Sequence, residues 1–496
     1  MLVYWKCACY NKMEYNDLEE DTMKKIKFGT DGWRAVMADD FTFSNVRLVT
    51  QAIACFLQKH PLKGNGVVIG YDNRFLSEHF AEEAAKVMAG NGVKALVVNR
   101  AAPTPVTAFA ITTYKACGAI MLTASHNPPE YNGIKFIPEY AGPALPDVTD
   151  KIEEELARVT KTGEMRSMPL KKAGEQGLYE EFDPMPAYIA HVKELIDVDA
   201  IYRANLKIVV DPMYGAGINY LDGILTELGC PVTALHNYRD PLFGGSLPEP
   251  CARVLSELRE RVLKEKADLG LALDGDADRF GVIDSDGEYL VANKILSLLY
   301  YHLLTVRGLK GPVARSVATT HMLDRIARSF GFQVDETPVG FKYIGESMMK
   351  RGSIMGGEES GGLSIQGHIP EKDGILACLL MAEIRAVHNK KLTEILHEID
   401  EKFGGAATER LDLRVDPKDK ERISREVKSF APENFCDRPV RERCTKDGLK
   451  LVLEDGSWLL IRASGTEPLF RIYVEADSKE ELEEIQHQVI KQFDMK

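Results

Sequence analysis

Short apolar segments that end abruptly in polar loops recur along this chain, and this recurrence constrains the fold more than any other feature. Strand-like and helix-like segments alternate in three successive rounds. The predicted strands lie at 67–69, 93–98, 120–122, 206–211, near 232, and at 269–273, 313–318, 332–335 and 353–355, and the predicted helices at 77–90, after Pro103, and at 217–228, 251–266 and 293–306. Such alternation is typical of βαβ units, so we predict mixed, mostly parallel sheets covered by helices.

The end of the chain has a different pattern. Residues 449–465 predict a strand, an Asp-Gly turn and a second strand, and 470–476 predict a third. A helix over 478–493 is expected to begin at a capping box formed by Ser478 and Glu481. This part is therefore predicted to be a small α+β module.

The length of the chain, 496 residues, exceeds what one ordinary hydrophobic core accommodates. Length alone predicts two to four domains. With the three α/β rounds and the C-terminal module, we predict three similar α/β domains followed by a smaller C-terminal α+β domain, with boundaries at 23–165, 166–288, 289–402 and 403–496. The first 22 residues lack the long apolar core of a signal peptide, and we expect them to form a poorly ordered extension.

Composition excludes several classes of partner. The net charge of −13 argues against a nucleic acid or an anionic membrane surface as the main partner. No segment reaches the roughly 18 apolar residues of a membrane span. The nine cysteines lack paired metal-binding spacing and predict reduced thiols in a cytoplasmic protein, either a monomer or a homodimer.

The loop 274-DGDADR-279 places three carboxylates within five residues, directly after an apolar strand. Alternate side chains of an extended loop point the same way, so Asp274, Asp276 and Asp278 would repel one another without a cation. Hard oxygen ligands in a small cluster suit Mg²⁺. The alternative is a solvated acidic turn; an EF-hand is excluded because Ser285, not Glu, occupies loop position 12.

Two further polar loops suit a sugar phosphate. In 357-GEESGG-362, Glu358 and Ser360 stand among glycines and could bind sugar hydroxyls, although the loop could also be a flexible surface turn. In 462-RASGTEPLFR-471, two arginines flank a polar turn. Arginine forks bind phosphate in a bidentate manner, and hydroxyls with backbone N–H groups complete an anion cradle; the alternative is a polar β-turn with incidental arginines.

The loop 123-TASHNP-128 follows the apolar strand at 120–122 and places a serine beside a histidine. Ser125 could be a helix cap or a turn residue. The G-x-S-x-G elbow of hydrolases is absent. A serine phosphate carries about −1.5 to −2 charge and would sit naturally on a Mg²⁺ ion held by three aspartates. We therefore interpret Ser125 as a phosphoryl carrier.

Together the motifs 28-FGTDGWR-34, TASHNP, DGDADR, GEESGG and 462-RASGTEP-468 closely resemble the α-D-phosphohexomutase superfamily, over essentially the whole chain from Lys24. The resemblance implies four domains around a central cleft, a phosphoserine, Mg²⁺ and a hexose 1,6-bisphosphate. It assigns the phosphoryl group to Ser125 and the metal to Ser125, Asp274, Asp276 and Asp278. The remaining roles are phosphoryl support by Arg34 and Arg279, acid/base catalysis by His126 or Lys135, sugar binding by Glu358 and Ser360, and binding of the remote phosphate by Arg462, Ser464, Gly465, Thr466 and Arg471.

Within this superfamily the chain looks most like the phosphoglucomutases. The segment 368-HIPEKDG-374 adds Lys372 to the substrate site, and 337-TPVGFKYI-344 adds Lys342. The sequence departs from related patterns at three positions: Gly362 replaces a histidine of dual mannose/glucose enzymes, Val339 replaces a frequent threonine, and Glu359 replaces a glutamine of phosphoglucosamine mutases.

The resemblance predicts interconversion of glucose 1-phosphate and glucose 6-phosphate through glucose 1,6-bisphosphate, which is both intermediate and activator. The alternatives are a dual-specificity phosphomannomutase/phosphoglucomutase, a Mg²⁺-dependent sugar phosphatase, and a non-catalytic regulator that binds hexose phosphates.

Overall fold

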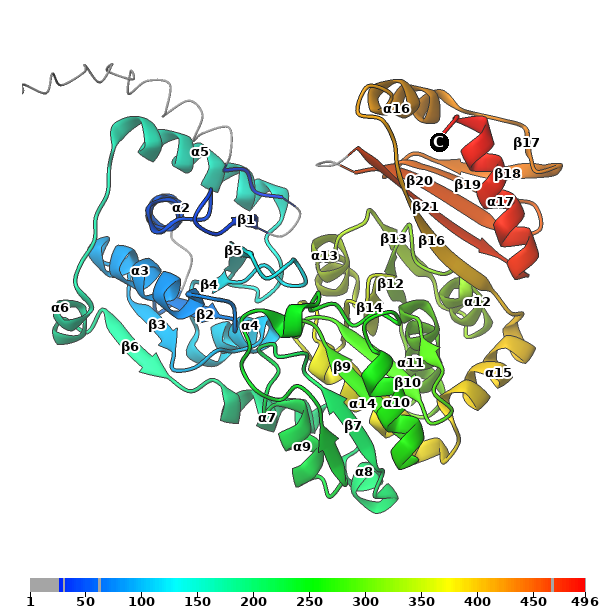
Figure 1. Ribbon diagram of the computed structural model, residues 1–496, viewed down its shortest axis with the longest axis horizontal. Helices are drawn as coiled ribbons and strands as arrows, with labels where there is room; N and C mark the ends of the chain where they lie inside the picture. The colour runs from blue at the N-terminus through cyan, green and yellow to red at the C-terminus, as the bar shows by residue number, and fades with distance from the viewer. Residues whose placement is uncertain (1–25, 30–31, 61–63, 465–467, 496) are drawn as a thin grey trace, which may run out of the picture.

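Four sheets follow one another along the chain, and each forms the centre of one domain (Figure 1). The computed structural model describes residues 26–29, 32–60, 64–464 and 468–495. The extension expected at 1–22 lies outside the described residues. We call the parts built on the four successive sheets domains I to IV. As predicted, the first three are α/β domains, and the fourth combines an antiparallel sheet with helices.

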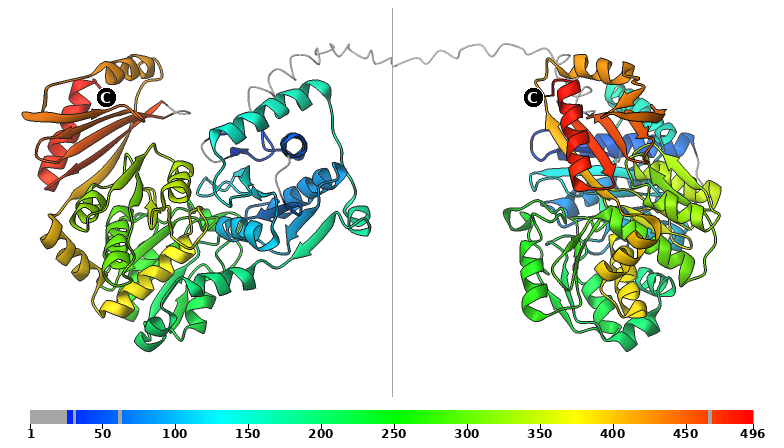
Figure 2. Two further views of the ribbon diagram at one scale, coloured as in Figure 1. Left: turned by 180° about the vertical axis from the view of Figure 1, so that it is seen from behind. Right: turned by 90° about the vertical axis from the view of Figure 1, so that its right-hand side faces the viewer.

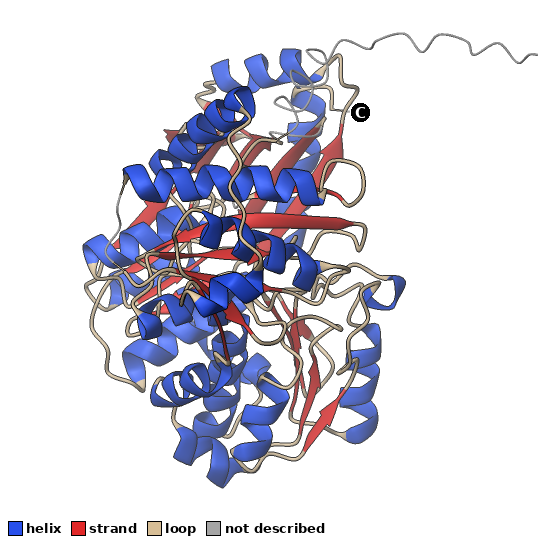
Figure 3. Cartoon of the chain, turned by 90° about the vertical axis from the view of Figure 1, so that its left-hand side faces the viewer, coloured by secondary structure: helices blue, strands red, loops and turns tan. Residues whose placement is uncertain are grey.

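Domain I contains a six-stranded sheet. Its strand order is β1 (Trp33–Val36), β5 (Tyr131–Pro138), β4 (Gly118–Leu122), β2 (Val67–Tyr71), β3 (Ala95–Val98) and β6 (Tyr179–Phe182). Its helices are α2 (Phe43–Lys59), α3 (Ser77–Gly90), α4 (Thr104–Tyr114), α5 (Pro146–Thr162) and α6 (Leu170–Glu175). The central strands are continuously apolar because helices cover both faces of the sheet (Figure 3).

Domain II follows the same plan with five strands. Their order is β11 (Tyr289–Leu290), β10 (Phe280–Asp284), β9 (Leu269–Leu273), β7 (Ile208–Asp211) and β8 (Val232–Ala234), with helices α7 (Met185–Glu194), α8 (Val198–Ala204), α9 (Leu221–Glu227) and α10 (Ser256–Glu265). Helices α9 and α10 begin four and five residues later than the apolar spacing predicted, because residues 217–220 and 252–255 form turns.

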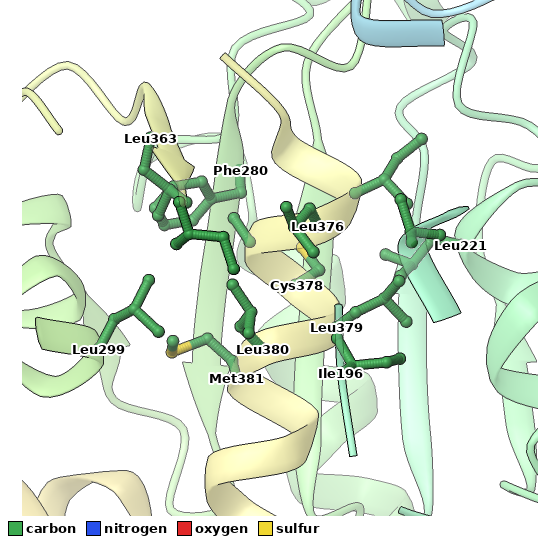
Figure 4. Packing of buried hydrophobic residues seen from close by; sticks show 14 of the residues in the cluster. Ile196, Leu221, Phe280, Leu299, Leu363, Leu376, Cys378, Leu379, Leu380 and Met381 are labelled. Carbon is green, nitrogen blue, oxygen red and sulfur yellow. The ribbon is translucent and has the colours of Figure 1, made fainter. Parts of the chain in front are cut away.

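Domain III contains the smallest sheet. The strand order is β13 (Val334–Thr337), β12 (Val313–Ser316), β14 (Met355–Gly357) and β15 (Leu363–Ile365), and the helices are α11 (Ala292–Thr305), α12 (Met322–Ser329), α13 (Phe341–Arg351), α14 (Gly374–His388) and α15 (Leu392–Phe403). Helix α14 is buried over most of its length. It packs Leu376, Leu379 and Met381 between side chains of domains II and III, which joins the two domains through one core (Figure 4).

Domain IV is wholly antiparallel, with strand order β16 (Ala407–Arg414), β21 (Leu469–Ala476), β20 (Trp458–Ala463), β19 (Leu449–Leu453), β18 (Arg438–Cys444) and β17 (Asn434–Phe435). Helices α16 (Lys420–Ser429) and α17 (Lys479–Gln492) cover its outer face (Figure 2). The sequence predicted only three of these strands. Charged residues in β16 and β18 hide the apolar pattern of these half-exposed strands.

Each predicted polar loop connects a strand to an antiparallel neighbour. The pairs are β4–β5, β9–β10 and β14–β15 in domains I to III and β20–β21 in domain IV. The first three loops therefore leave the carboxyl ends of the last parallel strands, where ligands of open α/β sheets bind. Among the described helices, none is long and apolar enough to cross a membrane.

Candidate active site

Ser125 lies in the connection from β4 to β5 and is only 1% exposed. Its backbone is in the left-handed region, with φ of 51°, a conformation that a non-glycine residue keeps only when its surroundings enforce it. The Ser125 hydroxyl lies 3.1 Å from Oδ2 of Asp274, to which it donates, and 3.2 Å from Nδ1 of His126. The predicted carrier serine and the first predicted metal ligand are therefore in direct contact.

Arg74, which the sequence analysis missed, enforces this loop conformation. The guanidinium of this fully buried residue donates four hydrogen bonds to carbonyl oxygens of the serine loop. The acceptors are Pro128 at 2.7 Å, Tyr131 at 2.9 Å, Ser125 at 2.7 Å and Asn127 at 2.6 Å. The available signal was that β2, like the other strands, ends in a polar loop, 72-DNR-74.

The three predicted metal ligands lie together in the connection from β9 to β10. Asp274, Asp276 and Asp278 are at most 1% exposed, and one carboxylate oxygen from each lies within 4.8 Å of the others. Gly275 allows this loop to touch the serine loop, because a Cβ at that position would lie 2.5 Å from the Ser125 carbonyl oxygen. Any side chain at Gly275 would push the two loops apart.

These carboxylates fit a divalent cation. Oδ1 of Asp276 and Oδ1 of Asp278 are buried, yet neither receives a hydrogen bond from any residue that the structure describes. Buried oxygens without a donor are costly unless a cation binds them. All-oxygen donor sets are the ligands that Mg²⁺ prefers.

Two lysines partly neutralise the triad. Lys135 Nζ lies 3.3 Å from Asp276 and 3.8 Å from Asp278, and Lys372 Nζ lies 3.1 Å from Asp278. Burial raises the pKa of Asp276, but Lys135 and other cations outweigh it and hold that pKa below its usual range. Burial and the two neighbouring carboxylates raise the pKa of Asp274 well above its usual range.

Helix α4 of domain I fixes the metal loop from the opposite side. The Thr104 N–H donates to the carbonyl of Asp276 at 2.9 Å, and the Thr104 hydroxyl donates to Oδ2 of Asp276 at 2.6 Å. Both contacts come from the first residue of the helix, where the helix dipole also favours negative charge. Thr104 is a second residue that sequence reasoning missed.

Cations and His126 border the serine. Arg34 donates from Nη1 to the Asn127 side chain at 2.8 Å, and the Arg279 N–H donates to Asp274 at 3.0 Å. Burial, together with Arg279 and Arg34, lowers the pKa of His126 to about 2. His126 is therefore neutral at pH 7, so its ring does not add a positive charge beside Ser125.

The sugar loop between β14 and β15 approaches this cluster through Glu358, which is 6% exposed and interacts electrostatically with Arg279. Ser360 lies in the turn of the same loop. A Cβ at Gly362 would lie 2.6 Å from Cδ of Lys372. The Lys372 side chain thus occupies the space that a histidine at position 362 would need.

The predicted phosphate cradle lies in domain IV. Arg462 and Arg471 stand directly opposite each other on β20 and β21. Like charges directly opposite each other on paired strands are unfavourable, and a bound anion would offset this cost. Ser464, 6% exposed, follows Arg462; Gly465 and Thr466 lie outside the described residues.

The cradle is tied to domain III through Asp447. Arg462 pairs with Oδ2 of Asp447 at 2.9 Å, and the same oxygen accepts from the Val339 N–H at 2.9 Å. Val339 precedes α13, whose second residue is Lys342. The Lys342 ammonium group lies over the Tyr343 ring, 5.4 Å from its centroid. The structure thus groups most of the predicted residues into a serine–carboxylate cluster and a separate arginine pair.

A hydroxyl beside a divalent-cation site can carry a phosphoryl group, since the cation and surrounding arginines and lysines offset the charge of that group. The fold and the site together therefore define the class, an α/β enzyme of phosphoryl transfer. The separate arginine pair lies where the sequence predicts that the remote phosphate binds.

The chain belongs to the phosphoglucomutase/phosphomannomutase family. Models of this family match all four domains: α/β/α domain I at residues 25–163, α/β/α domain II at 186–287, α/β/α domain III at 292–403 and the C-terminal domain at 411–492. Membership places the chain among the phosphohexomutases.

Known relatives are similar over nearly their whole length. A phosphoglucomutase/phosphomannomutase from Thermococcus kodakarensis is 32% identical, covering 92% of this chain and 96% of the relative. A "probable phosphoglucosamine mutase" from Thermococcus gammatolerans is 33% identical with the same coverage. The solved structure of a candidate phosphomannomutase from Thermus thermophilus is 34% identical, with a TM-score of 0.82, covering 95% of this chain and 99% of that one.

Proposed function

We propose that this phosphohexomutase interconverts glucose 1-phosphate and glucose 6-phosphate through a phosphoserine at Ser125. The observation that carries the proposal is the contact between the Ser125 hydroxyl and Asp274, 3.1 Å apart, inside a buried carboxylate triad. A phosphoryl group on this hydroxyl would face a cation that the triad would hold.

The proposed cycle has two matched transfers. The bond between phosphorus and Oγ of Ser125 breaks as a bond to O6 of glucose 1-phosphate forms, an acid/base group protonates the departing Oγ, and the same group takes the O6 proton. The resulting glucose 1,6-bisphosphate reverses its orientation in the site, so that its 1-phosphoryl group faces Ser125. The bond between phosphorus and O1 then breaks as a bond to Oγ of Ser125 forms, the Oγ proton is exchanged for one on O1, and glucose 6-phosphate leaves. The covalent carrier divides one difficult transfer into two easier ones.

Mg²⁺, when held by the triad and the serine phosphate, neutralises charge on the phosphoryl group in transfer. The chain's own residues do the rest. Arg74 fixes the serine loop and Thr104 fixes the metal loop. The positive charges of Arg34 and Arg279 offset the negative charge of the phosphoryl oxygens. Lys372 and Lys135, whose ammonium groups lie beside the triad, are placed to exchange the proton: the ammonium form donates to the departing oxygen, and the amine left behind accepts the proton of the attacking hydroxyl.

The sugar is proposed to be glucose because the segments at 357–362 and 368–374 resemble those of phosphoglucomutases. The filled space beside Gly362 supports this assignment, since the dual-specificity enzymes carry a histidine at this position and here the Lys372 side chain lies where a histidine would extend. The relatives' names include phosphomannomutase and phosphoglucosamine mutase, so the dual-specificity enzyme is the second candidate.

One set of assays separates the candidates. Purified protein is incubated with Mg²⁺, a trace of glucose 1,6-bisphosphate and the 1-phosphate of glucose, mannose or glucosamine. Coupled detection of each 6-phosphate should show the highest kcat/KM for glucose, and the discrimination should be about 10–200-fold, since the sugars differ only at C2. Equal kcat/KM values would favour dual specificity.

A parallel assay for inorganic phosphate tests the phosphatase alternative, and Ser125→Ala tests the carrier. The variant should lose nearly all mutase activity and remain folded, and phosphate should be found on Ser125 of the active wild type by peptide mass spectrometry. Full activity in the variant would contradict the phosphoserine mechanism. Release of inorganic phosphate without a 6-phosphate product would identify a phosphatase.

A further inference from the structure

The segment 368–373 holds Lys372 against the metal loop and ends at the first residue before helix α14. Its last residue, Asp373, is fully buried and caps this helix by accepting from the Leu376 N–H through Oδ1 at 2.9 Å. Asp373 directly follows Lys372, and because both of its carboxylate oxygens accept hydrogen bonds, it anchors the backbone next to the lysine. The position of Lys372 therefore depends on what holds Asp373.

The other oxygen of Asp373 ends a chain of two histidines. His368 donates from Nε2 to Oδ2 of Asp373 at 2.9 Å, and its Nδ1 lies 3.0 Å from Nε2 of His191. The Tyr188 hydroxyl also donates to Oδ2 of Asp373, at 2.7 Å. The His368 imidazole is fully buried.

This geometry allows one arrangement of protons when both rings are neutral. The carboxylate only accepts, so Nε2 of His368 carries the proton and Nδ1 accepts. His191 must then donate from its own Nε2. Burial and the neighbouring His368 lower the pKa of His191, which favours the neutral ring. The hydrogen bonds of the histidine chain are therefore donated in one direction, from His191 to His368 and from His368 to Asp373.

The hydrogen-bonded histidine chain begins in domain II, and a side chain of domain I packs against its first residue. His191 and Tyr188 belong to α7. Phe109 of α4 stacks on the His191 ring with centroids 4.4 Å apart and planes at 18°. The same helix α4 holds Asp276 through Thr104 at its first residue. One helix therefore fixes both the metal loop and the histidine chain.

We propose that His191 and His368 are positioning residues for Lys372. This inference rests on the proposed function, in which Lys372 exchanges a proton beside the triad. The histidines act through Asp373 rather than on the triad itself. They keep this carboxylate, and with it the lysine one residue earlier, in place. The chain also joins domains I, II and III behind the sugar-binding segment.

The protein contains a matched control at the other end of helix α14. There His388 Nε2 lies 3.3 Å from Nδ1 of His302, whose Nε2 lies 2.9 Å from Oε1 of Glu383. This is the same order of groups, histidine–histidine–carboxylate, with no lysine of the site attached to it. Removing the hydrogen bond between His388 and His302 tests the effect of losing a histidine chain that is not attached to the active site.

The test compares His191→Phe, His191→Gln and His388→Phe. Phenylalanine at 191 keeps the stacking on Phe109 and removes the donor, whereas glutamine restores a donor near the position of Nε2. We expect kcat of His191→Phe to fall about tenfold, the effect of one buried hydrogen bond. KM should stay within about twofold, since the remote phosphate is held elsewhere. His191→Gln and His388→Phe should stay within about threefold of the wild type.

A second readout does not depend on activity. Lys372, 7% exposed, is acetylated with acetic anhydride, and its labelling rate is followed by peptide mass spectrometry. We expect the rate to rise several-fold in His191→Phe and to stay unchanged in His388→Phe. His368→Gln serves as the second variant if His191→Phe does not fold.

The outcomes separate the two hypotheses. Unchanged kcat together with unchanged Lys372 labelling in His191→Phe would overturn the positioning role. Equal losses in His191→Phe and His388→Phe, with equal losses of thermal stability, would also overturn it by showing a purely structural effect. A wild type without mutase activity, but with the labelling contrast intact, would reject the proposed function and retain the positioning role.

Discussion

Replacing Arg74 by methionine should both destabilise domain I and slow the reaction. Methionine keeps most of the apolar stem but removes every donor. The four loop carbonyls that the guanidinium satisfies at 2.6–2.9 Å would lose that donor. Asp72, also fully buried, would lose the cation that lies 3.3 Å away.

The magnitude follows from the burial of this pair. Removing one partner of a buried ion pair typically costs about 3–5 kcal/mol, because the remaining charge stays desolvated. Hydroxyls of Thr123 and Ser77 still donate to Asp72, at 2.6 and 2.8 Å, so we expect the lower part of this range. At about 2–4 °C per kcal/mol for a domain of this size, Tm should fall by about 6–12 °C.

Activity should fall further than stability suggests. Without this clamp of four hydrogen bonds the left-handed backbone at Ser125 is held less firmly, and a misplacement of about 1 Å can cost about 100-fold in rate. The assay is the glucose 1-phosphate reaction at a temperature at which circular dichroism shows the variant to be folded. KM for the sugar phosphate should change little, because the arginine pair in domain IV is untouched.

Arg239→Ala is the matched control. This arginine also bonds the Arg74 segment, at 3.3 Å to its carbonyl, but pairs with Glu78 in an exposed position, where such contacts contribute at most about 1 kcal/mol. Its Tm and kcat should stay near those of the wild type. If Arg74→Met unfolds within about 2 °C of the wild type and keeps more than half of its kcat, the clamp has no positioning role.

Three further predictions concern the metal, the phosphate and pH. Asp276→Asn should weaken Mg²⁺ binding in a direct titration and abolish turnover, and chelation should silence the wild type reversibly; activity after exhaustive chelation would give the triad another role. Arg471→Ala should weaken glucose 1-phosphate and glucose 6-phosphate by a similar factor, at most about 3 kcal/mol, and leave the Mg²⁺ titration unchanged; a loss confined to metal affinity would place the phosphate elsewhere. Burial raises the pKa of Glu336, but Lys450 and Arg315 outweigh it and hold that pKa at about 2. A carboxyl group with a lowered pKa stabilises the fold above about pH 4.5, and this stabilisation is lost as pH falls toward 2. Glu336→Gln should therefore lower the free energy of unfolding in urea by about 3 kcal/mol at pH 7 and by progressively less below pH 4.5. A difference that does not depend on pH would contradict this role of Glu336.

The location of the chemistry could be predicted because polar loops interrupt apolar strands abruptly. The segments TASHNP, DGDADR and GEESGG each follow a strand that is buried on both faces, and their residue types suit the chemistry by themselves. The order of most parallel strands, and of the helices predicted at 77–90, 217–228, 251–266 and 293–306, followed from periodicity in the same way, whereas antiparallel strands such as β5 and β10 were not predicted. Strands β16 and β18 escaped prediction because half of their side chains are charged and exposed.

What holds these loops in place could not be read from the sequence. Arg74 lies 51 residues from Ser125, Thr104 lies 172 residues from Asp276, and His191 lies 177 residues from His368. No local pattern marks such pairs, since an arginine, a threonine or a histidine in isolation is compatible with many surroundings. Only the folded chain shows that Lys372 fills the space beside Gly362. The sequence determined which groups can react, because reactivity resides in residue types; the tertiary structure decided which of them meet, because contacts between distant residues depend on the packing of whole domains.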